Sequence, residues 1–187
     1  MFDVFIKGKA IDLIVLDEQT VENSNWYKWF NDEDNMKMMQ KHYFPNTKSM
    51  QMHFFKTEIE NNKSKIQLGI VHKKDSKLIG VISLNDIDYL NRKCEISGFI
   101  GEKEYQNFEL YTEANKLIIK HAFDNLNIHK IYGGTLIKEI SLMYCRALGF
   151  TEEGIKKSEI YKNGEYYDVY LIGLLRDEYC AKLKSGS

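Results

Sequence analysis

The stretch CEISGFIGEKEYQNFELYTEANKLIIKHAF, residues 94–123, contains the strand, loop and helix around which the fold is organised. CEISGFIG, residues 94–101, is short, apolar and bounded by polar residues, which is typical of a buried strand. EKEYQNF, residues 102–108, shows no apolar periodicity and is predicted to be a loop. From Leu110 onward, apolar residues recur at the spacing of one helix face. The stretch therefore predicts a strand that leads through a loop into an amphipathic helix.

The start of this helix is a candidate anion site. The first turn of a helix has backbone N–H groups without intrahelical partners, and the helix dipole places partial positive charge there. A phosphate group is the kind of ligand that such a position favours. Most strand–loop–helix units bind nothing, so the pattern alone does not identify a site.

The elements around this unit predict an α+β fold. The apolar run Ile131–Leu136 predicts a strand after the helix, and if the two strands are parallel neighbours, the helix is their crossover. The whole chain reads β, α, α, β, β, β, α, β, α, β, β. This order predicts one mixed, mostly antiparallel sheet with helices on both faces.

The remaining elements follow from apolar runs and turn residues. Further strands are predicted at Ala10–Leu16, Ile66–Val71, Leu78–Leu84, Glu153–Tyr161 and Glu165–Leu174. Helices are predicted at Thr20–Phe30, around Met36–Met39, from about Ser49 to Asn61 and at Lys138–Leu148, with Thr20 and Thr47 as candidate N-caps and Gly149 after the last helix. Asn163 and Gly164, between two strand-like runs, predict a tight hairpin.

Composition places the chain among ordinary globular proteins. Its 187 residues are 43% hydrophobic and 28% charged, and the formal net charge of -1 gives no global field that attracts nucleic acid or an anionic membrane. Cys94, Cys145 and Cys180 lack CxxC spacing, so we expect reduced thiols in a cytoplasmic protein. Charges interrupt the apolar run near the N-terminus, which argues against a signal peptide or membrane span. We expect one domain over residues 1–180 and a flexible end over residues 181–187.

Four stretches together resemble the GNAT superfamily of acyl-CoA-dependent N-acetyltransferases. They are YKWFND (27–32), CEISGFIG with EKEYQNFELYTEA (94–114), SLMYCRALGF (141–150) and YKNGEYYDVYLIGLL (161–175). They look most like the branch that contains ribosomal-protein N-terminal acetyltransferases and acetyltransferases of nucleotide-linked amino sugars. The resemblance implies a GNAT-like fold and acetyl-CoA as co-substrate.

The resemblance also implies a cofactor site. In the family a Q/R-x-x-G-x-G/A loop binds the pyrophosphate of CoA, and here Gln106 matches the first position. Glu109 and Tyr111 stand where the family has its small residues, and a carboxylate near a diphosphate repels it by about 1 to 4 kcal/mol at ~4 Å. Backbone N–H groups are present whatever the side chain. The implied cofactor-binding residues are Phe99, Ile100, Gly101, Gln106, Asn107, Phe108, Glu109, Leu110, Tyr111, Lys138 and Ser141.

By the same resemblance, the acetyl group passes directly to a neutral amine. Backbone N–H groups around Phe99–Gly101 are expected to stabilise the oxyanion, and Glu95 is a candidate base, although an ion pair across the sheet accounts for it equally well. Cys145 replaces the family's proton-donating tyrosine, so Cys145 and its neighbour Tyr144 are candidate acids. A small buried apolar residue is the alternative role for Cys145. Lys138 stands where the family commonly has Asn and is either a phosphate ligand or a solvated surface residue.

Other polar residues leave alternatives open. Asp86 and Asp88 follow a strand end and are either turn formers or acceptor ligands. The loop HYF, residues 42–44, either lines an acceptor pocket or packs on the sheet. His121 falls on the apolar face of the central helix and is expected in the core. The histidines and cysteines lack the spacing of a zinc site, so no metal is expected.

These observations predict an acetyl-CoA-dependent N-acetyltransferase that acts on a primary amine. By resemblance, the acceptor is an amino sugar, nucleotide-linked, or a protein N-terminus. The substitutions at Glu109, Tyr111 and Cys145 support an alternative, a GNAT-fold binding protein without transferase activity. The expected partners are a CoA thioester and an amine acceptor, with neither nucleic acid nor membrane. Tyrosines clustered in the closing hairpin are consistent with a homodimer.

Overall fold

A single eight-stranded sheet organises the computed structural model, which describes residues 2–37, 39–40 and 44–185. The strand order is β1-β2-β3-β4-β5-β6-β8-β7. All neighbouring strands are antiparallel except β5 and β6, which are parallel. The strands are β1 (Val4–Lys7), β2 (Ile11–Val15), β3 (Ile66–His72), β4 (Lys77–Asp88), β5 (Lys93–Ile100), β6 (Lys130–Thr135), β7 (Thr151–Lys162) and β8 (Glu165–Leu175).

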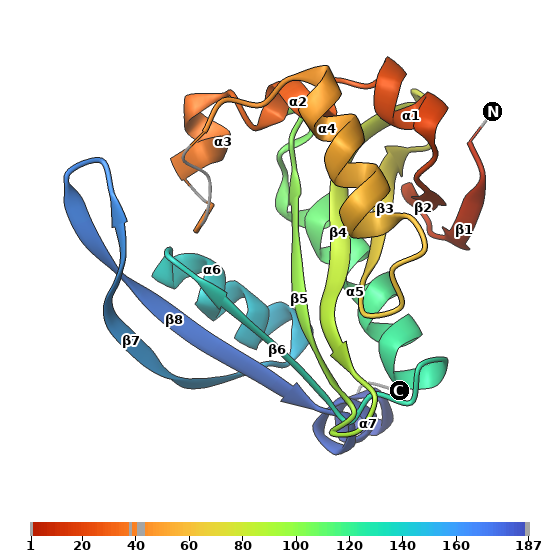
Figure 1. Cartoon of the computed structure of the whole chain (residues 1–187). Helices are drawn as coiled ribbons and strands as arrows, with labels where there is room; N and C mark the ends of the chain where they lie inside the picture. The colour runs from red at the N-terminus through yellow and green to blue at the C-terminus, as the bar shows by residue number, and fades with distance from the viewer. Residues whose placement is uncertain (1, 38, 41–43, 186–187) are drawn as a thin grey trace.

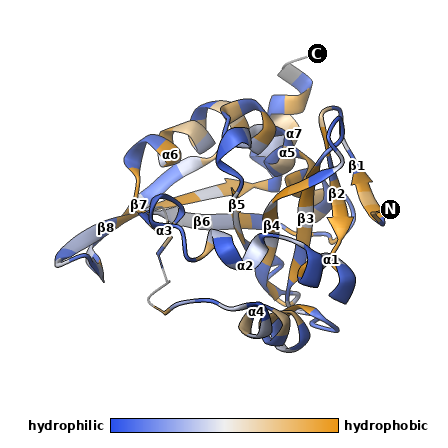
Figure 2. Ribbon diagram, turned by 90° about the horizontal axis from the view of Figure 1, so that it is seen from above, coloured by the Kyte–Doolittle hydropathy of each residue, from blue (hydrophilic) through white to orange (hydrophobic). Residues whose placement is uncertain are grey.

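Helices cover both faces of this sheet (Figures 1 and 2). One face carries α1 (Glu18–Asn23), α2 (Trp26–Trp29), α4 (Lys48–Phe54) and the π-helical segment η1 (Phe55–Ile59). The other carries α5 (Phe108–Asp124), α6 (Lys138–Met143), the π-helical segment η3 (Tyr144–Leu148) and α7 (Arg176–Ser185). The remaining helices are α3 (Glu33–Lys37) and the 3-10 turn η2 (Lys103–Tyr105). The predicted fold class, a mixed and mostly antiparallel sheet with helices on both faces, is confirmed.

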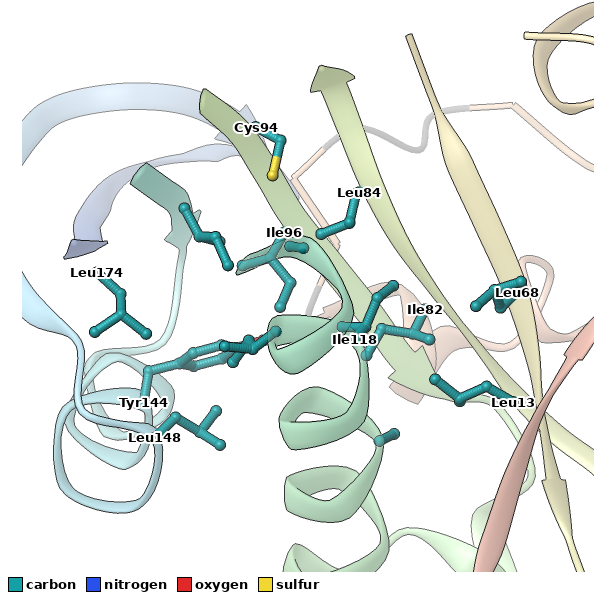
Figure 3. Packing of buried hydrophobic residues seen from close by; sticks show 14 of the residues in the cluster. Leu13, Leu68, Ile82, Leu84, Cys94, Ile96, Ile118, Tyr144, Leu148 and Leu174 are labelled. Atoms are coloured by element: carbon teal, nitrogen blue, oxygen red, sulfur yellow. The ribbon is translucent and has the colours of Figure 1, made fainter. Parts of the chain in front are cut away.

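Two apolar clusters form the core, one on each face of the sheet. The larger lies between the sheet and α5 and contains the buried residues Ile82, Ile96 and Ile118 (Figure 3). The smaller contains Trp29 and Phe99, whose rings meet edge to face with centroids 6.0 Å apart. Because alternate residues of a strand point to opposite faces, β5 contributes to both clusters.

The helix predicted at Thr20–Phe30 is in fact two helices. Helix α1 starts after Asp17, whose carboxylate accepts a 2.7 Å hydrogen bond from the backbone N–H of Thr20, so Asp17 rather than Thr20 is the N-cap. Ser24 is extended (φ -94°, ψ 168°) and separates α1 from α2. Short polar residues such as Ser24 and Asn25 compete for backbone hydrogen bonds and favour such breaks.

Several local signals are confirmed. Thr47 caps α4, and Gly149 ends the helix before β7 with φ 88°. Asn163 (φ 50°) and Gly164 (φ 85°) both adopt the left-handed conformation that a tight hairpin turn requires. Strand β1 and helix α7 were not predicted, and α7 includes residues 181–185, for which we expected a flexible end.

The β7–β8 hairpin extends beyond the layered part of the molecule (Figure 1). In the ribbon of Figure 2 the projecting end of the hairpin is coloured mostly from blue to white, and nearly every residue of β7 is exposed. Tyr161 and Tyr166 pack ring against ring, 5.1 Å apart, yet remain 56% and 67% exposed. Association of two copies through this hairpin stays a prediction, and gel filtration tests it.

Candidate active site

Strand β5 is paired along one edge and largely open along the other. On one side, Glu95–Ile100 pair with residues of β4. On the other side, β5 and β6 pair only where Lys93–Glu95 meet Lys130–Tyr132. Beyond these three pairs the strands separate (Figure 1). We call this opening, between residues 96–101 of the β5 side and Gly133–Gly134 of β6, the β5–β6 split.

The direction of the backbone groups shows which residues of β5 face the split. Gly101 N–H donates to Ile79 O of β4 (2.8 Å). Because the backbone groups of successive residues point alternately to the two sides of a strand, the N–H and C=O of Phe99 also point toward β4. Those of Gly98 and Ile100 point toward the split. Of the three residues expected to stabilise an oxyanion, only Ile100 thus has its N–H on the split.

The loop that follows β5 is fastened by Glu102. Its carboxylate accepts hydrogen bonds from Lys77 Nζ (2.7 Å), Trp29 Nε1 (2.9 Å) and Asn25 Nδ2 (3.2 Å). Burial by itself would raise the pKa of Glu102, but these donors outweigh it and the pKa lies below its usual value. A Cβ added at Gly101 would overlap the Trp29 ring, so glycine is required there.

Gln106, the expected pyrophosphate ligand, has its amide nitrogen bound within the protein. Gln106 Nε2 donates to Ile100 O (2.9 Å) and to Asn35 Oδ1 (2.7 Å). Asn35 is 1% exposed, and its own Nδ2 donates to Gly101 O (3.1 Å). The Gln106 side chain therefore anchors the loop to the end of β5. No sequence pattern singled out Asn35, because the partners that tie it to the end of β5, Gly101 and Gln106, lie more than 60 residues away in the chain.

Residues 35–37 and 39–40, the described residues on either side of position 38, bind both sides of the β5–β6 split, and we call them the bridging segment. At one end Asn35 binds the end of β5, and at the other Gln40 Nε2 donates to Gly134 O of β6 (2.6 Å). Lys162 Nζ of β7 donates to Met36 O and to Met39 O (2.7 Å). Burial lowers the pKa of this lysine. The bridging segment thus joins both sides of the split.

Helix α5 begins beside the split. Asn107 is its N-cap and accepts a hydrogen bond from the N–H of Leu110 (2.9 Å). The N–H groups of Phe108 and Glu109 lie in the first turn, where a helix provides no internal acceptor. Both side chains are exposed, whereas Leu110 is buried. The first turn therefore presents backbone donors, as predicted for an anion site, together with the Glu109 carboxylate.

Tyr111 reaches from α5 to the open edge of β5. Its hydroxyl lies 3.1 Å from Gly98 O and 2.8 Å from the Tyr144 hydroxyl. Tyr144 in turn lies 3.0 Å from Asn115 Oδ1, and Asn115 Nδ2 donates to Tyr111 O (2.8 Å). Burial raises the pKa of both tyrosines, most strongly that of Tyr144. These residues form a closed polar network between β5, α5 and η3.

The residues expected to act as acids lie away from the split or within this network. Tyr144 points from η3 toward α5 and into the apolar cluster (Figure 3), and it is 5% exposed. The pKa of Cys145 is raised, mainly by burial and also by the charge of Glu152. Ser141 is fully buried and donates to Glu152 Oε1 (2.7 Å), which places it against β7. Lys138 is exposed at the start of α6.

Glu95 lies on the face of the sheet that carries α1, α2 and α4. The carboxylates of Glu95 and Asp86 act on two neighbours, Lys65 and Tyr132. Burial lowers the pKa of Lys65 even though these charges and that of Glu58 oppose the change. For Tyr132, burial and then the charge of Glu95 raise the pKa. The predicted base therefore sits in a partly buried acidic environment.

Other candidates from the sequence have simpler placements. Asp88 accepts a hydrogen bond from the N–H of Asn91 (2.8 Å), as expected of a turn former. His121 is half-buried with its ring against Phe5, and burial lowers its pKa. His42 and Tyr43 lie outside the described residues. Within the described ranges, no cluster of three or more His, Cys, Asp or Glu is arranged to hold a metal ion, and no helix has the length and apolarity to cross a membrane.

Comparison with known sequences identifies a domain. A family model described as "Acetyltransferase (GNAT) domain" matches residues 15–151. YdaF of Bacillus subtilis (strain 168), provisionally named a ribosomal N-acetyltransferase, is 32% identical over 115 residues, which are 61% of each chain. Spermidine N(1)-acetyltransferase of Escherichia coli (strain K12) is 31% identical over 115 residues, 59% of this chain and 60% of the relative. The match thus spans about three-fifths of the length of these relatives.

Solved structures share the fold over nearly the whole chain. Spermidine N-acetyltransferase from Vibrio cholerae, in complex with CoA and spermine, superposes with a TM-score of 0.82 at 22% identity and covers 92% of this chain and 99% of that one. The microcin C7 self-immunity acetyltransferase MccE, in complex with acetyl-CoA and AMP, has a TM-score of 0.76 at 24% identity, with 90% and 93% covered.

Proposed function

Because this chain belongs to the GNAT acetyltransferase domain family, we propose that it transfers an acetyl group from acetyl-CoA to a primary amine. The observation that carries the proposal is the β5–β6 split, which opens next to the first turn of α5. An open strand edge pairs with extended chains that carry amide groups, and a helix N-terminus favours phosphate. The arm of a CoA thioester contains amides and ends in a diphosphate, so it suits both features.

The backbone supplies the groups that would hold the acyl donor. The first-turn N–H groups of Phe108 and Glu109 suit the diphosphate, and Ile100 N–H, which faces the split, suits the oxygen of the thioester carbonyl. Gln106 and Asn35 support these groups by fixing the loop and the end of β5. A rigid support of this kind keeps the donors in place before the substrate arrives.

Glu95 is the proposed base. An ammonium has no lone pair, so a proton must move to a base such as Glu95 before the amine nitrogen attacks. The attack forms the C–N bond of the amide and breaks the C–S bond of the thioester. The nitrogen loses its second proton as the amide forms, and the leaving thiolate takes up one proton, giving CoA, while the first proton remains on Glu95 until it passes to solvent. The acidic surroundings of Lys65, which include Asp86 as well as Glu95, favour an acceptor that carries positive charge.

Three classes of acceptor are worth comparing directly. The sequence suggests a nucleotide-linked amino sugar or a protein N-terminus. Three of the relatives are named for spermidine and one, provisionally, for ribosomal proteins. We propose the same test for all three: purified protein with acetyl-CoA and, in turn, a nucleotide-linked amino sugar, a peptide with a free N-terminus, and spermidine, with release of free thiol as the readout.

Calorimetric titration with acetyl-CoA and with CoA comes before this screen. Binding in the micromolar range supports the transferase. Absence of binding at millimolar cofactor contradicts it and favours the second candidate, a GNAT-fold binding protein without transferase activity. Two observations motivate that candidate, namely the Glu109 carboxylate in the first turn of α5 and the Tyr111 hydroxyl on the open edge of β5.

Glu95→Gln tests the role of the base. Because the amide cannot accept the proton, we expect kcat to fall by about 10²- to 10⁴-fold while the affinity for acetyl-CoA stays within about twofold. Asp86→Asn is the control, since it removes a neighbouring negative charge and should act mainly on KM for a cationic acceptor. If Glu95→Gln lowers thermal stability but leaves kcat unchanged, Glu95 serves an ion pair instead.

A further inference from the structure

The Tyr111 network has one proton fewer than it has oxygen contacts. Three contacts join its oxygens: Gly98 O to Tyr111, Tyr111 to Tyr144, and Tyr144 to Asn115 Oδ1, at 3.1, 2.8 and 3.0 Å. Each phenol has one hydrogen, so only two of these contacts contain a proton. The amide of Asn115 cannot turn to supply another, because its nitrogen already donates to Tyr111 O.

Gly98 O and the Tyr144 hydroxyl therefore compete for the hydrogen of Tyr111. If Tyr111 donates to Gly98 O, the hydrogen of Tyr144 goes either to Asn115 Oδ1, which leaves the two hydroxyl oxygens facing each other without a proton, or to Tyr111, which leaves Asn115 Oδ1 without a donor. If Tyr111 donates to Tyr144, every contact is satisfied except that of Gly98 O. Tyr144 and Asn115 are buried, so a polar contact without a proton inside the network is costly, and a new donor at the half-buried Gly98 O would free the hydrogen of Tyr111 for Tyr144. A ligand N–H that donates to Gly98 O should therefore contribute more binding free energy than an ordinary hydrogen bond does.

The carbonyl of Gly98 lies where an extended ligand would pair with β5. Gly98 lies on the open edge of β5, between the β5–β6 pairs that end at Glu95 and the bridging segment bound at Gly101. The amide N–H groups of an extended arm that pairs with this edge must donate to its carbonyls, and Ile100 O already accepts from Gln106. Gly98 O is the next carbonyl on the same edge, and the Tyr111 hydroxyl is its present partner.

We propose that Tyr111 competes with the acyl donor for the Gly98 carbonyl and thereby sets how tightly this chain binds a CoA thioester. This inference rests on the proposed function, because it assigns an affinity-determining residue within the same site. When an amide N–H of the arm donates to Gly98 O, Tyr111 turns its hydrogen to Tyr144. Tyr144 then donates to Asn115, so Gly98 O, the Tyr144 hydroxyl and Asn115 Oδ1 each have a donor.

Two single-atom variants separate this role from simple packing. Tyr111→Phe keeps the ring and removes the competing hydroxyl, so calorimetry should show acetyl-CoA and CoA binding about three- to tenfold more tightly than to the wild type. Tyr144→Phe is the matched control. It removes the alternative acceptor and leaves Tyr111 with Gly98 O alone, so binding should be unchanged or up to about twofold weaker. A core-packing role predicts instead that both variants lose stability and neither gains affinity.

The outcomes also separate this inference from the proposed function. The competition is supported if Tyr111→Phe binds the cofactor more tightly than the wild type and Tyr144→Phe shows no such gain. Unchanged or weaker binding by Tyr111→Phe overturns it. If the wild type binds no cofactor but Tyr111→Phe does, the competition stands and the transferase assignment of the wild type fails. If Tyr111→Ala binds but Tyr111→Phe does not, the ring and not the hydroxyl excludes the acyl donor, and the competition is overturned. If none of these proteins binds although near-ultraviolet circular dichroism shows them folded, the competition is overturned.

A measurement without ligand gives an independent check. In protein labelled with ¹³C at the carbonyl of glycine, the Gly98 signal reports its hydrogen bond. We expect it to move upfield in Tyr111→Phe, where the donor is lost, and downfield in Tyr144→Phe, where the donor has no other acceptor. Shifts in the same direction in both variants contradict the contested hydrogen.

Discussion

The two edges of β5 differ although they belong to the same eight residues. Toward β4 the strand pairs almost continuously, and its end is fastened by Glu102, Trp29 and Lys77. Toward β6 it pairs over three residues and is then open, with Gly98 O and Ile100 O bound only by side chains among the contacts described. The first edge is built for stability, and the second keeps backbone groups within reach of a ligand.

This difference shows how one strand can serve folding and binding together. Backbone groups on a buried strand cost free energy if they lack partners. On the β4 edge a neighbouring strand provides those partners, while on the split the side chains of Tyr111 and Gln106 provide them. Gln106 is held by Asn35, whereas the hydroxyl of Tyr111 has a second partner in Tyr144, so Gly98 O is the carbonyl that remains available.

Gly101→Ala should disturb the end of β5 on the side that pairs with β4, and of these variants we expect it to reduce the free energy of unfolding most. A Cβ at this position would overlap the ring of Trp29, and we expect a loss of about 2 to 3 kcal/mol, or about 4 to 12 °C in Tm. Gly133→Ala, which faces the split, is the control. Its Cβ would lie 3.2 Å from Ile96 O, and we expect less than about 1 kcal/mol. Equal losses in thermal denaturation would contradict the contrast between the two edges.

Glu102→Gln should weaken the closed edge in a pH-dependent way. The pKa of Glu102 is lowered in the folded chain, so its contribution is complete above the unfolded pKa of about 4.3 and is lost as pH falls through the folded value. We expect the variant to be about 1 to 2 kcal/mol less stable near pH 7, a difference that shrinks below about pH 4. Denaturant unfolding at several pH values checks this.

Glu104→Gln is the matched control for that series. Glu104 is exposed and binds the same lysine, Lys77 (2.6 Å), so its loss should change the free energy of unfolding little at any pH. If the two variants behave alike, Glu102 is not what fastens the end of β5.

Glu109→Gly should strengthen ligand binding beside the open edge of β5, and of these variants we expect it to have the smallest effect. The carboxylate of Glu109 lies in the first turn of α5, where it repels a diphosphate, so its removal should tighten CoA binding about two- to fourfold at low salt. Glu109→Gln separates charge from backbone freedom and should give most of the gain. Weaker binding, or a gain that persists in molar salt, would show that repulsion is not the cause.

Much of the fold could be predicted because its signals are local. Gly149 and the pair Asn163–Gly164 adopt the left-handed conformations that their types favour, and the parallel pairing of β5 with β6 follows from the helix between them. The break at Ser24 was missed because the surrounding apolar residues suit one continuous helix. Strand β1 was missed because it has only four residues.

The site was harder to predict because its contacts join distant residues. Gln106 was expected to bind a ligand, yet Asn35 and Ile100 O occupy its amide nitrogen. Tyr144 and Cys145 are neighbours in sequence but differ in surroundings, one inside the Tyr111 network and the other near Glu152. Which neighbour a side chain meets depends on packing across elements, and periodicity does not report that. The roles of Glu95, Ile100 and Lys138 remain predictions.

The bridging segment changes the kind of opening that the split provides. The ladder at Glu95 closes one end, and the chain from Asn35 to Gln40 closes the other by binding Gly101 and Gly134. The opening is therefore a window in the sheet and not a notch at its border. Hydrogen bonds within the fold therefore set the width of this window at both of its ends. A ligand that pairs with β5 meets a frame that the protein has already assembled.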